Sequence, residues 1–480
     1  MKVLLMVTPP ENVLELEISD EMARHTGFFP PLGLLYLATY MKHNSKHDVL
    51  VVDGESEQLS LKAIEQRLLK IQPDVLGITA FTHTLRSVLD AIKLAKRVLP
   101  DCKIVLGGPH IALYPVESVE FEDVDYCVMG EGERSFLELV NLLEKKLPLE
   151  AHEQELVKIE GIVFKKADGR VHKNGFARIP ELDALPFPDR GFVDKSSYFC
   201  ILGKNRLMTT VMSSRGCPFQ CTFCNTPDHT YRYRSPINVV NEMEMLAKDG
   251  IEEIFFFDDL FNINSQRVIE ICDEILRRNV KVKWAFRGRV RGITDELAKK
   301  CAMAGCERIQ YGIEKGTDKM LKKLNKNVTV TDVVNAVKLT KKYGMMAVGN
   351  FLLFTPGEDE KDAEEDIRFA LSLPLDHAEF NVFIPYPGTR IYSDGLRSGF
   401  FERDYWAEFA RNPDPDFQLV WEEKVKKEKM YQINAMAHKR FYLRPRIVFN
   451  ELMRISSWKD FTRIANGAKV ILNLGFRSSN

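Results

Sequence analysis

The sequence predicts an α/β protein with two successive parallel sheets and a helical segment at its carboxyl end. First, residues 1–145 alternate short apolar runs with segments of helical periodicity, which is typical of a doubly wound parallel sheet. Second, residues 206–395 repeat a strand and then a helix six times, which indicates a partial (β/α)6 barrel. Third, residues 396–480 interleave basic and aromatic side chains as amphipathic helices do. Residues 146–205 lie between the two sheets as a linker.

Length and composition bound the class of protein. A chain of 480 residues suits two to four domains, and its net charge of -1 gives no reason to expect a nucleic-acid partner. Nine cysteines, three of them clustered, are not a secreted disulfide framework. The apolar start is too short for a signal peptide, and no run of 18 apolar residues is present. We therefore expect a cytoplasmic protein in a reducing compartment.

The first segment carries its polar and glycine residues where predicted strands end. Such sheets bind ligands at the carboxyl ends of their strands. Thr8-Pro9-Pro10 follows the first strand where a nicotinamide or flavin site would need G-x-G-x-x-G, so that site is not expected. The predicted strands are Lys2–Val7, Asp48–Val52, Val75–Thr79, Lys103–Leu106 and Tyr126–Met129, with helices at Leu61–Ile71 and Leu85–Val98, and the ligand-facing residues are Thr79, Gly107, Gly108, His110, Glu131 and Gly132.

The linker contains one element of regular structure. Apolar residues 159–164 and residues 170–173 flank Ala167-Asp168-Gly169, which predicts a β-hairpin. Residues 185–190 are punctuated by proline and predict irregular chain.

A cysteine loop opens the second segment. Cys217, Cys221 and Cys224 follow the spacing C-x3-C-x2-C, so three thiolates within eight residues can converge on one inorganic centre. Three protein ligands leave a coordination position open, as catalytic centres do. Two alternatives remain. The cysteines could merely pack in a core, or they could hold a structural zinc ion with His229 as the fourth ligand.

The second segment places charged residues at the carboxyl ends of its strands. Asp258 and Asp259 could accept hydrogen bonds from an ammonium group, or cap a helix. Arg287, together with Arg289, could bind a carboxylate or form a surface salt bridge, and Glu314 could accept hydrogen bonds from a ligand. The predicted strands are Leu207–Ser213, Glu253–Asp258, Trp284–Arg287, Arg308–Tyr311, Ala347–Phe354 and Glu379–Ile384.

The carboxyl end has its own charge. From Lys424 onward the chain has thirteen Lys and Arg residues and three acidic residues. This segment therefore has a net charge of +10 in a chain of net charge -1. One interpretation is peripheral contact with an anionic membrane, which would suit a lipid-like substrate. The alternative is a helical cap that packs on the barrel and leaves its charges in solvent.

Taken together, these motifs resemble those of the radical S-adenosylmethionine (SAM) enzymes that carry a cobalamin-binding domain, the group that includes the class B methyltransferases. The resemblance covers the cysteine loop and the strand ends of both sheets. It implies that Cys217, Cys221 and Cys224 hold a [4Fe–4S] cluster whose fourth iron is chelated by SAM. It further implies that Phe223 packs near the adenine of SAM.

The resemblance also suggests roles for the other strand-end residues. Asp258 or Asp259 would hold the methionine amino group of SAM, Arg287 a carboxylate of SAM or substrate, and Glu314 the ribose hydroxyls or the amino group. No histidine has Asp two residues before it, so the D-x-H-x-x-G motif that supplies a lower cobalt ligand is absent. The resemblance places the cobalamin site at Thr79, Gly107, Gly108, His110, Glu131 and Gly132.

The implied function is transfer of a methyl group from methylcobalamin to an unactivated carbon, after a 5'-deoxyadenosyl radical has abstracted hydrogen from it. The implied substrate is a lipid, a tetrapyrrole or a natural-product precursor, and the implied reductant is a flavodoxin or ferredoxin. A cyclase or ring-rearranging enzyme with the same cofactors is the first alternative. A tRNA methylthiotransferase would need more amino-terminal cysteines than Cys102 and Cys127. A zinc-stabilised binding module is the non-enzymatic alternative.

Overall fold

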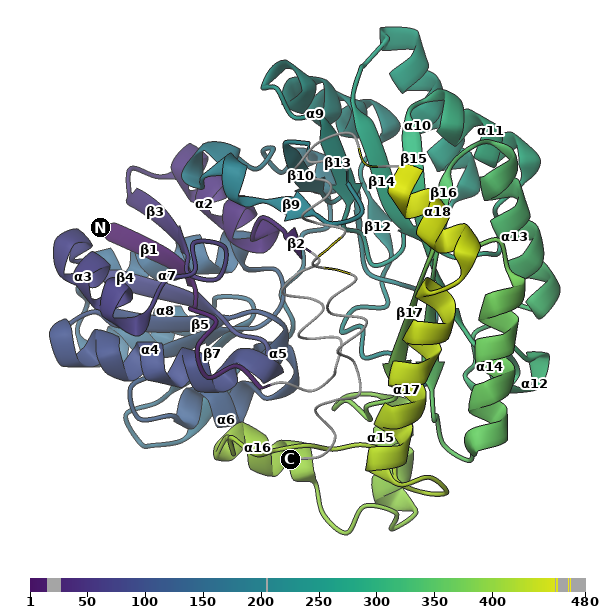
Figure 1. The fold of residues 1–480 in the computed structure, drawn as a ribbon. Helices are drawn as coiled ribbons and strands as arrows, with labels where there is room; N and C mark the ends of the chain where they lie inside the picture. Colours follow the sequence, from purple (N-terminus) through teal and green to yellow (C-terminus); the bar gives the residue numbers. More distant parts are fainter. Residues whose placement is uncertain (15–26, 204–205, 454, 456–464, 466, 468–480) are drawn as a thin grey trace. The chain divides into compact units, whose positions relative to one another are not determined.

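A computed structural model describes residues 1–14, 27–203, 206–453, 455, 465 and 467. The described chain packs into two compact units, and Figure 1 shows a sheet with helices in each. The first unit comprises residues 1–14 and 30–197 together with Ser398–Phe417, and the second comprises the remaining described residues. The four-part division drawn from the sequence stays a prediction.

The first unit is built on a seven-stranded sheet in the order β3-β1-β4-β5-β6-β7-β8. Its first five strands are parallel, and the last two form an antiparallel hairpin that pairs with β6. The predicted hairpin therefore exists, and it extends this sheet rather than standing alone. The strands are β1 (Lys2–Val7), β3 (Asp48–Asp53), β4 (Val75–Thr79), β5 (Lys103–Gly107), β6 (Tyr126–Val128), β7 (Ile162–Lys165) and β8 (Val171–Lys173).

Helices cover both faces of the first sheet, which confirms the doubly wound prediction. Alternate residues of each buried strand point to opposite faces. Leu4 and Met6 of β1 pack with α3 and α4, whereas Val3 and Leu5 pack with α2 and α7. The helices of this unit are α2 (Leu32–Asn44), α3 (Leu61–Ile71), α4 (Leu85–Val98), α5 (Pro109–Leu113), α6 (Pro115–Glu120), α7 (Gly132–Glu144), α8 (Leu149–Leu156) and α16 (Tyr405–Arg411).

The second unit is built on six parallel strands in chain order, β10-β13-β14-β15-β16-β17, as predicted for a partial barrel. The strands are β10 (Met208–Val211), β13 (Glu253–Phe256), β14 (Lys283–Gly288), β15 (Cys306–Glu314), β16 (Met346–Leu353) and β17 (His377–Val382). The connecting helices are α9 (Pro236–Lys248), α10 (Ser265–Arg278), α11 (Asp295–Met303), α12 (Asp318–Lys323), α13 (Val330–Lys342), α14 (Glu360–Ser372) and α15 (Arg390–Arg397).

The two faces of the second sheet differ in polarity. The face toward the helices is apolar, and its aromatic side chains Phe286, Tyr311, Phe351 and Phe380 are fully buried in the core. The opposite face, set by the same strand register, carries Arg287, Gln310, Asn350 and Glu379. We call this second face the inner face. Its polarity matters for the site.

Helix α17 (Lys427–Tyr442) closes the second unit beside β17. Met430, Ile433 and Phe441 are buried in the same core as the sheet, and Asn434 donates to the carbonyl of Phe380 at 2.5 Å. This part of the basic segment is therefore the packed cap that the second interpretation describes. Helix α18 (Pro445–Met453) follows it, and basic residues 454, 459, 463, 469 and 477 lie outside the described residues.

Candidate functional site

The cysteine loop is held closed at both ends. It begins after β10, and β11 (Ser214–Arg215) pairs antiparallel with β12 (Arg232–Tyr233) across its base. Gly216 has a φ of +82°, and a Cβ there would lie 2.4 Å from the carbonyl oxygen of Thr230. Only glycine fits so close an approach of two backbones. This close approach fixes the base of the loop.

The three cysteines belong to this one loop, although no group of three His, Cys, Asp or Glu side chains among the described residues is arranged to hold a metal ion. Burial raises the pKa of the Cys217 thiol, and the neighbouring charges of Cys224 and Cys221 raise it further. Burial also raises the pKa of Cys221, while Lys326 and then Arg289 lower it. Two cations thus lie close enough to stabilise a thiolate at Cys221. Three mutually coupled thiols beside positive charge fit the ligand set of an iron–sulfur cluster.

Arg289 and Lys326 border the loop from opposite sides. The Arg289 guanidinium carbon lies 3.8 Å from the ring centre of Phe219, and its Nε and one terminal nitrogen are buried without a partner among the described residues. Lys326 donates to Glu314 at 2.8 Å, and its ammonium lies 5.4 Å from the ring centre of Phe223. Sequence reasoning did not single out Lys326, which lies in no recognisable motif.

Asp258 and Asp259 have different surroundings. Asp258 is buried and accepts three hydrogen bonds of 2.6 Å, from the amide and hydroxyl of Ser213 and the hydroxyl of Ser214. Asp259 is open to solvent and accepts one hydrogen bond, from the amide of Gly216 at 3.0 Å. Neither caps the following helix, because Asn264 caps α10, so the helix-capping alternative is wrong. Asp259 is the carboxylate that remains available to a ligand.

Glu314 ends β15 with a φ of +69°, a left-handed conformation that a glutamate rarely adopts. Its carboxylate is buried and paired with Lys326. Backbone strain held by a buried ion pair is common at functional sites.

Arg287 has no ion pair or hydrogen bond in the described chain, so it does not form the surface salt bridge considered above. Its guanidinium carbon lies 4.5 Å from the ring centre of Phe257.

In the first unit, the predicted ligand-facing residues gather at one sheet edge. Thr79 and Gly107 are paired at the ends of β4 and β5, and Gly132 begins α7 after β6. Gly108 has a φ of +98°, and a Cβ there would lie 2.7 Å from the Thr79 hydroxyl. Glu131 differs from the others because its carboxylate accepts the amide of Ile179 at 2.6 Å.

His110 is the buried polar side chain of this edge. Its Nδ1 lies 3.0 Å from the Thr82 hydroxyl, and its Nε2 has no partner among the described residues. Burial lowers the pKa of His110 to about 4, so the ring is neutral at physiological pH. An unpartnered neutral nitrogen beside a tight glycine turn fits a site for a bound polar cofactor.

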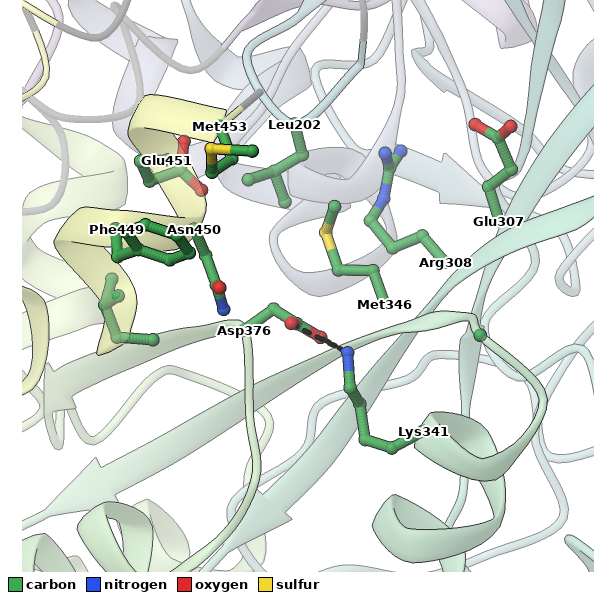
Figure 2. Close-up of a pocket in the computed structure, with 12 residues that line it drawn as sticks. Leu202, Glu307, Arg308, Lys341, Met346, Asp376, Phe449, Asn450, Glu451 and Met453 are labelled. Atoms are coloured by element: carbon green, nitrogen blue, oxygen red, sulfur yellow. Dashed lines mark hydrogen bonds and ion pairs between the residues drawn. The ribbon is translucent and has the colours of Figure 1, made fainter. Parts of the chain in front are cut away.

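A pocket lies at the amino ends of the strands, away from the cysteine loop. It has a volume of about 440 Å³ and is lined by Arg308, Met346, Phe449 and Met453 among others. Figure 2 shows its Lys341 and Asp376 side chains pointing toward each other, and they pair at 2.7 Å. Barrel chemistry occurs at the carboxyl ends of strands. We therefore assign the candidate site to the cysteine loop and the inner face.

Two family models and several relatives match this chain. A Radical SAM superfamily model matches residues 211–370, and a B12 binding domain model matches residues 21–140. An uncharacterised methyltransferase of Pyrococcus horikoshii is 32% identical over 94% of this chain and 95% of its own. The anaerobic magnesium-protoporphyrin IX monomethyl ester cyclase of Rubrivivax gelatinosus is 29% identical over 78% of this chain and 67% of its own.

Among solved structures, the radical SAM methyltransferase TsrM of Kitasatospora setae, with cobalamin and a [4Fe–4S] cluster bound, has a similar fold. The TM-score is 0.66 at 19% identity, over 83% of this chain and 78% of that one. At this identity the likeness concerns the fold. It confirms the predicted succession of a doubly wound domain and a partial barrel.

Proposed function

The chain belongs to the cobalamin-binding radical SAM enzymes, and from that premise we propose that it transfers a methyl group from a corrinoid to an unactivated carbon of a small molecule. Its family cofactors are a [4Fe–4S] cluster, SAM and cobalamin. When bound, the cluster and SAM supply a radical that abstracts hydrogen, and the corrinoid supplies the methyl group. The observation that carries the proposal is the three-cysteine loop that follows β10 at the carboxyl ends of a parallel sheet.

Different residues of this chain would bind the cluster and the parts of SAM. Cys217, Cys221 and Cys224 would hold the cluster. Asp259 would accept from the amino group of SAM, because it is the open carboxylate beside the loop. Glu314, oriented by Lys326, would accept from the ribose hydroxyls.

Phe223 would pack near the adenine, and Lys326 lies beside its ring. In the first unit, the turn at Gly108 and the neutral His110 would contact the corrinoid, with Thr79, Gly107, Glu131 and Gly132 shaping the same edge. His110 is not proposed as a cobalt ligand.

The test follows a labelled methyl group. Protein purified without oxygen and loaded with cluster and cobalamin is given SAM with a deuterated methyl group and a small-molecule extract. We expect a product heavier by the labelled methyl, formed by wild-type protein but not by Cys224→Ala. Cys272→Ala is the matched control, because Cys272 is buried in the core away from the loop. Iron, sulfide and corrinoid contents are measured on the same samples.

The cyclase relative supports a second candidate, a ring-forming reaction without methyl retention. SAM cleavage to 5'-deoxyadenosine with no labelled product would favour this candidate over methyl transfer. A zinc-stabilised binding module is excluded by family membership. Its required fourth ligand, His229, has its Nδ1 3.0 Å from the Cys217 carbonyl.

Peripheral membrane contact and a flavodoxin or ferredoxin donor stay proposals. No helix among the described residues is long and apolar enough to span a bilayer. Exposed Val448, Phe449, Leu452 and Met453 on α18 support membrane contact. Several described basic side chains instead hold the cap in place, as Arg440 does by pairing with Glu364 at 2.6 Å. Flotation with anionic vesicles, comparing the full chain with a variant that carries Phe449→Ser, Leu452→Ser and Met453→Ser, decides the question.

A further inference from the structure

The inner face of the second sheet carries two pairs of opposite charges. One pair is in direct contact, and the other is not. In the layer nearer the amino ends, Arg308 and Glu253 are buried and pair directly at 3.1 Å. Toward the carboxyl ends, Arg287 on β14 lies one layer further and Glu379 on β17 lies two layers further. Within the described part of the chain, neither of these two has a hydrogen bond or ion pair. They attract each other without direct contact, so both charges remain available to a ligand.

Two amide side chains lie between these charges. Gln310 is opposite Arg287 in the register of β14 and β15, and Asn350 is opposite Glu379 in that of β16 and β17. Gln310 donates to Asn350 at 3.3 Å, so the two amides share the inner face. Across four neighbouring strands the groups are cation, amide, amide and carboxylate, and the last two are displaced by two residues toward the carboxyl ends of the strands. We call Arg287, Gln310, Asn350 and Glu379 the polar row.

Electrostatics agree with this geometry. Arg287 is exposed and Glu379 is half-buried. Burial lowers the pKa of Arg287, against the attraction of Glu379 and Asp259. Burial raises the pKa of Glu379, against the attraction of Arg287. A ligand with complementary charges would offset the hydration that both groups lose, because a partly desolvated charge is stabilised by a partner.

Aromatic side chains border the Arg287 end of the polar row. Phe29 lies 5.8 Å from Phe255 and 5.7 Å from Phe257 between ring centres, and Arg287 stacks on Phe257 at 4.5 Å. This stacking fixes the guanidinium plane while leaving its N–H groups free. The arrangement is suited to an anionic group carried by a small molecule.

We propose that the polar row binds the substrate, and that the substrate is a small zwitterionic molecule whose anionic group contacts Arg287 and whose protonated amine contacts Glu379. This inference rests on the proposed function and narrows its substrate from a small molecule in general to an amino-acid-like one. Gln310 and Asn350 would hydrogen-bond the polar atoms between the two charges.

The methionine part of SAM also carries an amino group and a carboxylate. Binding of SAM must therefore be distinguished from binding of a separate zwitterionic substrate. Asp259, the open carboxylate of the cysteine loop, follows β13, whereas Glu379 lies on β17, four strands along the sheet. Four strand spacings are about 19 Å along the sheet, less across its curvature. A SAM head chelated at the cluster would contact Asp259, which leaves Glu379 for a second molecule.

The experiment titrates named probes into protein loaded with cluster, cobalamin and SAM, using calorimetry. The zwitterions are glycine, β-alanine and γ-aminobutyrate, and the single-charge analogues are butyrate and butylamine. We expect at least one zwitterion to bind more tightly than either analogue. Glu379→Gln should weaken that binding by roughly ten- to hundredfold, the loss expected for one charge-assisted hydrogen bond. Glu365→Gln, an exposed carboxylate on α14, is the matched control and should change nothing.

A titration with SAM shows whether the polar row binds SAM or a separate substrate. We expect Glu379→Gln to bind SAM and iron as wild-type protein does. Equal weakening of SAM would assign the polar row to the SAM site and overturn the proposal, as would a zwitterion that binds Glu379→Gln unchanged or no zwitterion binding at all. Probe binding without any labelled methyl product would instead count against methyl transfer and leave the polar row standing.

Discussion

Lys326 donates to Glu314 across 2.8 Å, and the same ammonium group lies 5.4 Å from the ring centre of Phe223 in the cysteine loop. Both side chains are largely buried. Removing one partner of a buried pair leaves an uncompensated charge, which is more damaging than removing both.

We expect Lys326→Met to lower the free energy of unfolding by about 3 kcal/mol, because Glu314 is left buried and unpaired. The double variant with Glu314→Gln should recover most of that loss. Chemical denaturation followed by circular dichroism measures both. A double variant that is as unstable as the sum of its single changes would show that the two residues act independently.

Gly216 should be required for cluster binding. Gly216→Ala places a methyl group against the Thr230 carbonyl in a left-handed backbone conformation, so the loop must shift. We expect a several-fold loss of iron per chain after reconstitution. Gly169→Ala is the control, since Gly169 has a φ of +83° with open space around it. Equal iron in both variants would contradict the role of the close approach.

Substitutions at Asp258 and Asp259 should affect different properties. The first should lower stability, and the second should weaken SAM binding. Asp258→Asn loses hydrogen-bond acceptance from Ser213 and Ser214 and should destabilise the protein by about 2 kcal/mol. Asp259→Asn should leave the unfolding free energy nearly unchanged and weaken SAM binding by about tenfold. Denaturation and SAM titration of both variants check this. The reverse pattern would mean that Asp258 is the cofactor ligand.

Asp366 should give the protein a pH-dependent stability. It lies with Glu358 around the fully buried Lys315. Burial raises the pKa of Asp366 from 3.8 to about 6, with Lys315 opposing the rise and Glu358 adding to it. Because the folded state favours the protonated carboxyl, its contribution is fully present below about pH 4 and is lost as pH rises to about 6.

Relative to Asp366→Asn, wild-type protein should therefore lose up to about 3 kcal/mol of stability between pH 4 and pH 6. The measurement is the free energy of unfolding of both proteins across this range. Parallel curves would show that Asp366 titrates near its ordinary pKa in the folded state.

Much of the fold could be read from local pattern. The strands predicted at Lys2–Val7 and Val75–Thr79 and the helices at Leu61–Ile71 and Leu85–Val98 match the structure residue for residue. Such elements are set by periodicity within a dozen residues. Strand ends in the second sheet were less accurate, as where β15 (Cys306–Glu314) extends past both ends of the predicted strand.

The sequence by itself determined the cysteine loop and the family, because the C-x3-C-x2-C spacing and the strand-end motifs are local properties of the chain. Only the tertiary structure decided which charges have partners. Asp258 and Asp259 are adjacent, yet one is satisfied by two serines more than 40 residues away and the other is open. Lys326, Gln310, Asn350 and Glu379 belong to no motif, although Arg308 and Gln310, two residues apart on β15, were a signal for the inner face. Partner identity depends on strand register and curvature, which bring together side chains far apart in sequence.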